Sequence, residues 1–332
     1  MTSRRLKFTN FPGPFITHGI DIIPDSSHPI GRDAAIYLLA VNHLPNPSFS
    51  PSSSNPLSTR GARSQLELFH HVLGTSTIRH VRSIWHPLIR TPNDIFAESV
   101  NSVYVTNDHK YAEHGVMRSL EDLYAGAKWT EVVHLQLNSL EAKEAGDGVT
   151  ASVALPAIHH CNGLGHGRED GEILVASCTG GVLHIGGVPA EKTNNSKGDK
   201  NITLVDAVSI DHIVDNPTYF ADPYATSPSN DKSGFVLAGL GKAIDLSKTM
   251  RDITATEPVI VTYVTKNASN GGKWEKRVLF EDDGTRIRTA SAAVLVPVDP
   301  KEEEGEGEGE RKAWLFVTGF LSKSVVAVKV DL

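Results

Sequence analysis

Cysteine is scarce in this sequence: its 332 residues include only Cys161 and Cys178. The two do not form a metal-binding motif, and a single pair does not by itself indicate an oxidising compartment. They could face each other across a hairpin as a disulfide or stay two buried thiols. The second interpretation is favoured.

Long apolar runs and basic clusters are also missing. No stretch approaches the roughly 18 consecutive apolar residues that a membrane-spanning helix needs. The start, MTSRRLKFTNFPG, has basic residues but lacks the apolar segment of a signal peptide. With a net charge of −7 and no basic stripe, the chain has little attraction for a phosphate backbone. The sequence therefore predicts no membrane segment in this chain and no nucleic acid partner.

Three common catalytic motifs are absent as well. The sequence has no G-x-S-x-G nucleophile elbow, no H-E-x-x-H zinc motif and no phosphate-binding P-loop. These absences disfavour a serine hydrolase and a nucleotide hydrolase.

Short strand signals separated by turn residues fill the chain. The continuous apolar run at residues 35–41 is typical of a strand buried on both faces. After residue 162, short strands alternate with glycine and asparagine turns. These features predict one all-β domain over residues 1–332, and their recurring spacing favours a β-propeller over a sandwich.

Three segments depart from this rhythm. Residues 46–63 are rich in Ser and Pro and predict a flexible surface loop. Residues 112–127 predict one amphipathic helix lying on a face of the sheet structure. Its apolar stripe consists of Val116, Leu120, Leu123 and Tyr124. Residues 301–312, KEEEGEGEGERK, predict an acidic low-complexity loop.

Polar residues of the kind that bind metals recur at the ends of the apolar runs. They are His18, Asn93, Asp94, Asn107, Asp108, His109, Asn162, Asp215 and Asn216. Asn93, Asn162 and Asp215 are separated by 69 and 53 residues, close to a propeller blade of roughly 40 to 50 residues when the first interval holds an insertion. One such residue per blade would converge on a central channel. Amide and carboxylate oxygens without thiolates predict calcium rather than zinc or copper.

Each of these residues also has an ordinary structural explanation. Asn and Asp are common turn residues, because their side chains bond to their own backbone. An isolated histidine is more often a satisfied core residue than a catalytic one. Only the joint occurrence of His18 and His43 with the oxygen donors favours a functional site.

Seven segments occur in the same order as in a known family. They are HGID (18–21), IYLLAVNHLP (36–45), SQLELFHHV (64–72), HPLIRTPNDI (86–95), VYVTNDHKY (103–111), CNGLG (161–165) and VDNP (214–217). On these segments the chain resembles the serum paraoxonase/arylesterase lactonases. The resemblance implies a six-bladed β-propeller with two calcium ions in its central tunnel, which hydrolyses lactones and aryl esters.

The resemblance also implies a role for each matching residue. The ligands of the catalytic calcium would be Asn93, Asn162, Asp215 and Asn216, and those of the structural calcium Asp94 and the backbone carbonyl of Ile20. His18 and His43 match a general base and the histidine that orients it, with Asp215 as the alternative base. His109, Asn107 and Asp108 would lie behind the metal ligands.

One part of the family pattern is missing. The family carries a Glu-Asp pair upstream of its HGI motif, one carboxylate for each calcium, and the 17 residues before His18 contain no acidic residue. We therefore expect an N-terminally truncated relative with an incomplete first blade and weakened calcium sites. The family suggests secretion or membrane association, and an incomplete gene model would explain the missing signal. The alternatives are a non-catalytic propeller that serves as a binding or structural scaffold, and a sugar-lactone hydrolase or strictosidine-synthase-like propeller.

Overall fold

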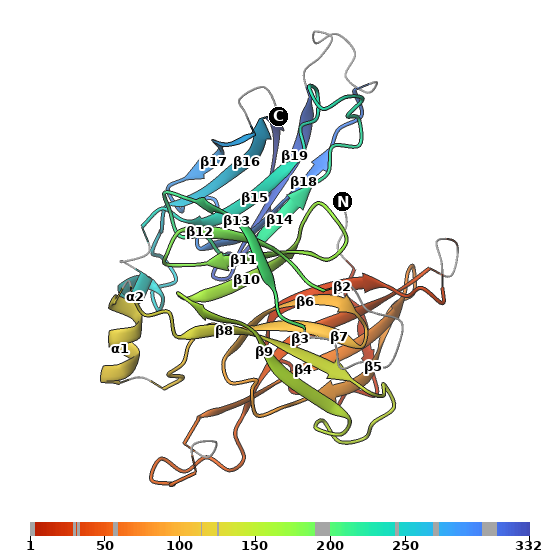
Figure 1. Cartoon of the computed structure of the whole chain (residues 1–332), viewed down its shortest axis with the longest axis vertical. Coiled ribbons are helices and arrows are strands. Elements are labelled where there is room, and N and C mark those ends of the chain that lie inside the picture. The colour runs from red at the N-terminus through yellow and green to blue at the C-terminus, as the bar shows by residue number, and fades with distance from the viewer. Residues whose placement is uncertain are drawn as a thin grey trace. The chain divides into compact units, whose positions relative to one another are not determined.

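The computed structural model describes residues 4–28, 31, 34–55, 59–113, 115–124, 126–189, 200–242, 246–267, 272–300 and 311–332. Within these ranges the chain forms five β-sheets and two short helices (Figure 1). In four of the sheets, strands that follow each other in sequence lie side by side, as they do in propeller blades. The fold is all-β and of the β-propeller type, as the sequence predicts. Five blades are described, and the sixth stays a prediction.

The chain divides into two compact units. The first comprises Met1–Asn162 and Pro189–Ile202, and the second comprises Gly163–Val188 and Thr203–Leu332. That the whole chain forms a single domain therefore stays a prediction.

The first unit contains two sheets. One has the strand order β1-β5-β4-β3-β2 and the other has the order β6-β7-β8-β9. Their strands are β1 (Lys7–Thr9), β2 (Thr17–Pro24), β3 (Ala35–Pro45), β4 (Ala62–Val72), β5 (Thr77–Ile84), β6 (Pro92–Ser99), β7 (Ser102–Asn107), β8 (Thr130–Leu137) and β9 (Val149–Ile158).

Apolar side chains from both sheets form the core of the first unit. Leu39, Ala40 and Val41 are consecutive in β3 and are all fully buried. Both faces of this strand are therefore covered, as the continuous apolar run predicts. Leu39 and Val41 belong to the same core cluster as Leu66 and Val105, and burying each such side chain contributes about 1.5 to 3 kcal/mol.

The second unit contains three sheets. Their strand orders are β10-β11-β12-β13, β14-β15-β16-β17 and β18-β19-β20. The strands are β10 (Cys161–His166), β11 (Glu172–Ser177), β12 (Val182–Gly187), β13 (Thr203–Ser209), β14 (Pro217–Phe220), β15 (Gly234–Leu240), β16 (Val259–Asn267), β17 (Lys273–Asp282), β18 (Ala290–Pro297), β19 (Lys312–Gly319) and β20 (Val326–Asp331). The helix α2 (Leu246–Thr249) precedes β16, and the first two residues of β10, Cys161 and Asn162, belong to the first unit.

The helix predicted over residues 112–127 is present but shorter, as α1 (Val116–Leu123). Its first and last residues are 84% and 85% exposed. The buried residue of the helix is Glu121, whose carboxylate accepts the backbone N–H groups of Lys110 and Tyr111 at 2.8 and 3.1 Å. The prediction that the apolar stripe packs on a sheet is therefore wrong among the described residues. Hydrogen bonds to a buried carboxylate tie the helix to the preceding loop instead.

The structure also bears on the predicted loops and on the two cysteines. β4 begins at Ala62, so the last two residues of the predicted loop 46–63 belong to a strand. Most of the acidic stretch 301–312 lies outside the described residues. No disulfide joins Cys161, which is buried, to Cys178, which is half-buried. In the described part of the chain, no helix is long and apolar enough to cross a membrane.

Candidate functional site

Two predicted catalytic histidines lie side by side on adjacent strands of the first unit. Nδ1 of His18 in β2 is 3.2 Å from Nε2 of His43 in β3. The other ring nitrogen of His43 lies 2.8 Å from Oγ of Ser64, which stands opposite His43 in the antiparallel register of β3 and β4. His43 is thus held between His18 and Ser64. The structure brings the pair together, and Ser64 is a member of the group that the sequence analysis did not single out.

Both histidines are held toward the neutral form. Burial among neighbouring groups lowers the pKa of His18, although part of its ring still has solvent access, and the carboxylate of Asp108 opposes this effect. Burial also lowers the pKa of His43, with a smaller contribution from His18 and the same opposition from Asp108. A neutral imidazole can accept a proton, which is what a general base must do near pH 7.

Asn93 and Asp94 lie in an irregular part of β6. The register between β6 and β7 shifts between Pro92 and Ile95, so these two residues lie in a β-bulge. A bulge changes the direction in which side chains point, which is why bulges are common beside functional sites. Both residues are 5% exposed. The backbone N–H of Asp94 donates to Oγ1 of Thr106 at 3.0 Å, which fixes the bulge against β7.

The backbone of β2 approaches this bulge at Gly19. A Cβ atom at this position would lie 2.3 Å from the carbonyl oxygen of Asn93 and 2.4 Å from Oδ1 of Asp94. Only glycine therefore fits here. Ile20, whose carbonyl is the predicted ligand of the structural calcium, is the next residue along the same strand.

Asp108 links the bulge to His109. Its carboxylate lies 2.9 Å from Nδ1 of His109 and accepts a 3.4 Å hydrogen bond from the amide of Asn93. Burial alone would raise the pKa of Asp108, but the contacts with His109 and Asn93 outweigh it and keep this pKa below its usual range. A negative charge is therefore kept beside Asn93.

Asn107 has a supporting position. Its amide oxygen accepts the backbone N–H groups of Arg90 and Thr91 at 2.8 and 3.0 Å, and its amide nitrogen donates to the carbonyl of Leu88 at 2.8 Å. These bonds fix the segment that leads into β6. The side-chain oxygen of Asn107 thus already accepts two hydrogen bonds and offers no spare acceptor to a metal. Its place behind the metal ligands stays a prediction.

Asn162 has an unsatisfied oxygen. Among the described residues, its side-chain Oδ1 is buried and has no hydrogen-bond partner. Leaving a buried polar atom unpaired costs about 1 to 3 kcal/mol. Coordination to a hard cation would offset that cost, since amide oxygens are calcium ligands.

The second unit presents the same feature at Asn216. Its Oδ1 is also buried without a hydrogen-bond partner among the described residues. Its backbone N–H donates to the carbonyl of Ser291 at 2.9 Å, and the N–H of Asp215 donates to that of Ala238 at 3.0 Å. A Cβ atom on Gly163 would lie 2.5 Å from the carbonyl oxygen of Asp215. The Asp215–Asn216 pair is therefore held rigidly by its own unit.

A pocket of about 220 Å³ opens beside the histidine pair in the first unit. His18, His43, Asp108 and His109 all line it. Its other lining residues come from the start of β4, the segment that leads into β6, and α1 with the loop before it: Arg60, Ala62, Ser64, Arg90, Thr91, Pro92, Ala112, Glu113 and Arg118. Histidines and carboxylates, which can transfer protons, thus share one cavity with arginines, which can stabilise negative charge.

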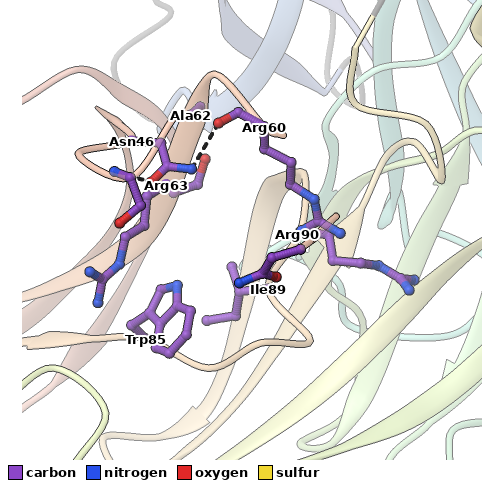
Figure 2. Close-up of a pocket in the computed structure, with 10 residues that line it drawn as sticks. Asn46, Arg60, Ala62, Arg63, Trp85, Ile89 and Arg90 are labelled. Carbon is purple, nitrogen blue, oxygen red and sulfur yellow. Dashed lines mark hydrogen bonds between the residues drawn. The ribbon is translucent and has the colours of Figure 1, made fainter. Parts of the chain in front are cut away.

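A second pocket of about 230 Å³ adjoins the first, because Arg60, Ala62, Ser64 and Arg90 line both. Figure 2 shows this second pocket, with Arg63 beside Trp85 on one side and Arg60 beside Arg90 on the other. No sequence pattern marks these arginines as site residues, because two of them fall in the segment 46–63, whose composition predicts a flexible loop.

Among the described residues, two clusters of histidine and carboxylate contain none of the predicted calcium ligands. One of them includes His109, which is predicted to lie behind the ligands. Asp25, His28 and His70 form one, and His109, Asp122 and His160 form the other. In the first cluster both histidines lie 2.9 Å from the same oxygen of Asp25, so the carboxylate is already engaged. Imidazole nitrogens suit zinc or copper, whereas calcium takes oxygen ligands. Neither cluster fits calcium as well as the Asn and Asp oxygens do.

The predicted site residues lie in the part of the chain that matches a known protein family. The arylesterase family model matches residues 18–218, which run from His18 to just beyond Asn216. Serum paraoxonase/arylesterase 1 of Mus musculus is 28% identical over 200 residues, which are 60% of this chain and 46% of that protein. Serum paraoxonase/arylesterase 2 of Homo sapiens is 24% identical over 261 residues, 76% of this chain and 63% of that protein. The chain thus spans about half to two thirds of the length of the curated relatives it matches.

Proposed function

Because the chain belongs to the arylesterase family, we propose that it is a calcium-dependent hydrolase of lactones and aryl esters. The family membership rests on the match over residues 18–218. The calcium and the roles of single residues belong to the proposal, which the geometry of each unit supports.

The observation that carries the proposal is the unsatisfied oxygen of Asn162. A folded chain rarely buries an acceptor without a partner, and such atoms mark unfilled ligand positions or strained sites. Asn216 in the second unit also has a buried side-chain oxygen without a partner among the described residues. Both asparagines match positions that the family resemblance implies as calcium ligands. We assign Asn93, Asn162, Asp215 and Asn216 to the catalytic ion, and Asp94 with the carbonyl of Ile20 to the structural ion. When bound, calcium would polarise the scissile carbonyl and stabilise the oxyanion that forms.

The chain's own residues supply the proton transfer. His18, with its lowered pKa, takes the proton from the attacking water, and Asp215 is the alternative base. His43 holds the ring of His18 through the 3.2 Å contact, and Ser64 in turn holds His43 at 2.8 Å. In sites that activate a water, the base is commonly oriented by a second group, which is itself held by a third. His18, His43 and Ser64 follow this order.

The proposal is tested with purified protein, phenyl acetate and δ-valerolactone. We expect turnover with calcium and its loss with a chelator. His18→Gln should lower kcat by about 10²-fold to 10⁴-fold, the usual contribution of a general base. Equal activity in calcium and in chelator would contradict the metal role.

Calcium binding is measured separately by titration calorimetry. Asn162→Ala should weaken calcium binding by about tenfold or more, since even residues behind a metal ligand contribute that much. Asn138→Ala, which changes an exposed asparagine of the same unit, is the matched control and should bind calcium like the unaltered chain. Calcium binding without turnover of any ester would favour the alternative function, a non-catalytic scaffold.

A further inference from the structure

The pocket in Figure 2 is a cationic cavity next to the histidine pair. It lies at the end of the β3–β4 hairpin, and Arg60, Arg63 and Arg90 all line it. None of the described residues that line it is a carboxylate. Such a concentration of positive charge is notable because the chain as a whole carries a net charge of −7. We refer to this cavity as the arginine pocket.

Two of these guanidinium groups have unused donors as far as the described residues go: in that part of the chain, neither Arg60 nor Arg63 donates a side-chain hydrogen bond or forms an ion pair. The guanidinium carbon of Arg63 lies 4.7 Å from the ring centre of Trp85, which fixes its plane by a cation–π contact. Each arginine carries five N–H donors in a planar fork that matches a carboxylate.

The third arginine is partly neutralised. Arg90 is paired with the carboxylate of Glu131, but its Nε is buried and has no hydrogen-bond partner in the described part of the chain. Burial, and next the positive charge of Arg90, lower the pKa of Arg60, and only Glu113 opposes them. Glu113 is already engaged, since its carboxylate accepts the backbone N–H of Gly61 at 2.7 Å. Like charges are therefore held close together with little compensation, and a bound anion would relieve that repulsion.

The arginine pocket adjoins the pocket of the histidine pair. Arg60, Ala62, Ser64 and Arg90 line both cavities. Ser64 is also the residue whose hydroxyl lies 2.8 Å from His43. A molecule whose carbonyl lies beside His18 could thus extend past Ser64 and reach the arginines.

We propose that the arginine pocket binds a carboxylate of the substrate, so that this chain acts preferentially on esters or lactones with a free carboxylate remote from the scissile carbonyl. This inference rests on the proposed hydrolase function and adds a substrate class to it. Arg60 and Arg63 line opposite sides of the pocket and supply the positive charge and the N–H donors that this carboxylate requires.

The test compares two aryl esters that differ in one group. Phenyl acetate is neutral, and monophenyl succinate carries a carboxylate at the far end of its acyl chain. We expect a higher kcat/KM for the succinate ester in the unaltered chain. In Arg60→Gln/Arg63→Gln the ratio of the two kcat/KM values should fall by about tenfold or more, since hydrogen bonds to charged groups contribute at least that factor.

The matched control is Arg79→Gln, which removes an exposed arginine of the same unit that does not line either pocket. It should leave the ratio unchanged. An equal ratio in the pocket variant and the unaltered chain, or a preference for the neutral ester, would overturn the inference and leave the hydrolase proposal intact.

A second measurement does not depend on turnover. Calorimetry with succinate should detect binding to the unaltered chain, and the Kd should rise at least tenfold in Arg60→Gln/Arg63→Gln but not in Arg79→Gln. Inorganic phosphate is titrated in parallel, and binding of phosphate in preference to succinate would contradict the assignment of a carboxylate. If no ester is hydrolysed while succinate still binds through the arginines, the function proposal fails and the binding site stands.

Discussion

His43 is the residue whose surroundings say most about the candidate site. One ring nitrogen faces His18 at 3.2 Å and the other faces Ser64 at 2.8 Å. A neutral imidazole has one donor and one acceptor nitrogen. When Nε2 of His43 is the acceptor, Nδ1 of His18 carries the proton and Nε2 of His18 is free to accept another, so the tautomer of His43 determines whether His18 can act as a base. The hydroxyl of Ser64 can serve either tautomer, because it both donates and accepts.

The pH dependence of hydrolysis should follow the lowered pKa of the histidines. Activity requires the neutral base, so kcat/KM should rise with pH and level off above the pKa of His18. Because burial lowers that pKa, the midpoint of the rise should lie below 6.5, the ordinary value for histidine. The measurement is kcat/KM against pH at saturating calcium.

Asp108 provides the check on this interpretation. Its carboxylate opposes the effect of burial on both His18 and His43, so Asp108→Asn should move the midpoint to still lower pH. Asp147→Asn, at an exposed position of the same unit, should leave it in place. A midpoint above 6.5, or an upward shift in the Asp108 variant, would show that another group is the base.

At the level of elements, the site depends on how closely β2 approaches the bulge of β6. The strands meet at Gly19, where added atoms would collide with the backbone of Asn93 and the carboxylate of Asp94. Ala97 in β6 also donates its N–H to the carboxylate of Asp21 at 2.7 Å, which holds the two strands together. The spacing of β2 and β6 here is therefore set by a glycine, which has no side chain, and by one partly buried hydrogen bond.

Gly19→Ala should destabilise the fold and disturb the predicted structural calcium site. A Cβ atom 2.3 Å from a backbone oxygen cannot be accommodated by a rotamer change, and overpacking of this kind costs about 1 to 3 kcal/mol. Denaturant unfolding with and without calcium measures both effects.

The control for this variant is Gly187→Ala in β12. A Cβ atom there would meet nothing within 4 Å, so the free energy of unfolding should change by about 0.5 kcal/mol or less. If the two alanine variants lose equal stability, the close approach of β2 to β6 is not what requires glycine at position 19.

At the scale of the whole molecule, the two units can unfold together or separately. The sequence predicts one domain, and the chain divides into two compact units. The second unit contains a buried ion pair that serves as a sensitive probe. Nε and Nη2 of Arg288 donate to the two carboxylate oxygens of Glu257 at 2.6 and 2.8 Å. Arg288 and Glu257 are both buried.

Arg288→Ala should lower the stability of the whole chain if it unfolds as one domain. Removing one partner of a buried ion pair leaves an uncompensated charge and costs about 3 to 5 kcal/mol. Hydrogen exchange at increasing denaturant, followed by mass spectrometry, would report the unfolding midpoints of peptides from β4 and from β18. We expect both midpoints to fall together. A fall confined to β18 would show that the two units unfold separately.

Much of the fold and part of the site follow from local patterns. The apolar run at 35–41 predicts a strand covered on both faces, and Leu39, Ala40 and Val41 are buried. The same reasoning failed for α1. Helical spacing of Val116 and Leu123 indicates an amphipathic helix, but spacing cannot tell whether a sheet face is available to cover the stripe.

The sequence by itself determined the all-β class, the family and the residue types of the predicted site, because strand period, turn residues and ordered motifs are written in consecutive positions. Only the tertiary structure decided that Ser64 orients His43, that Gly19 must lack a side chain, and that Arg60 and Arg63 share a cavity with Trp85. These are contacts between strands and loops distant in the chain. Their distances depend on register and bulges, which no local pattern specifies.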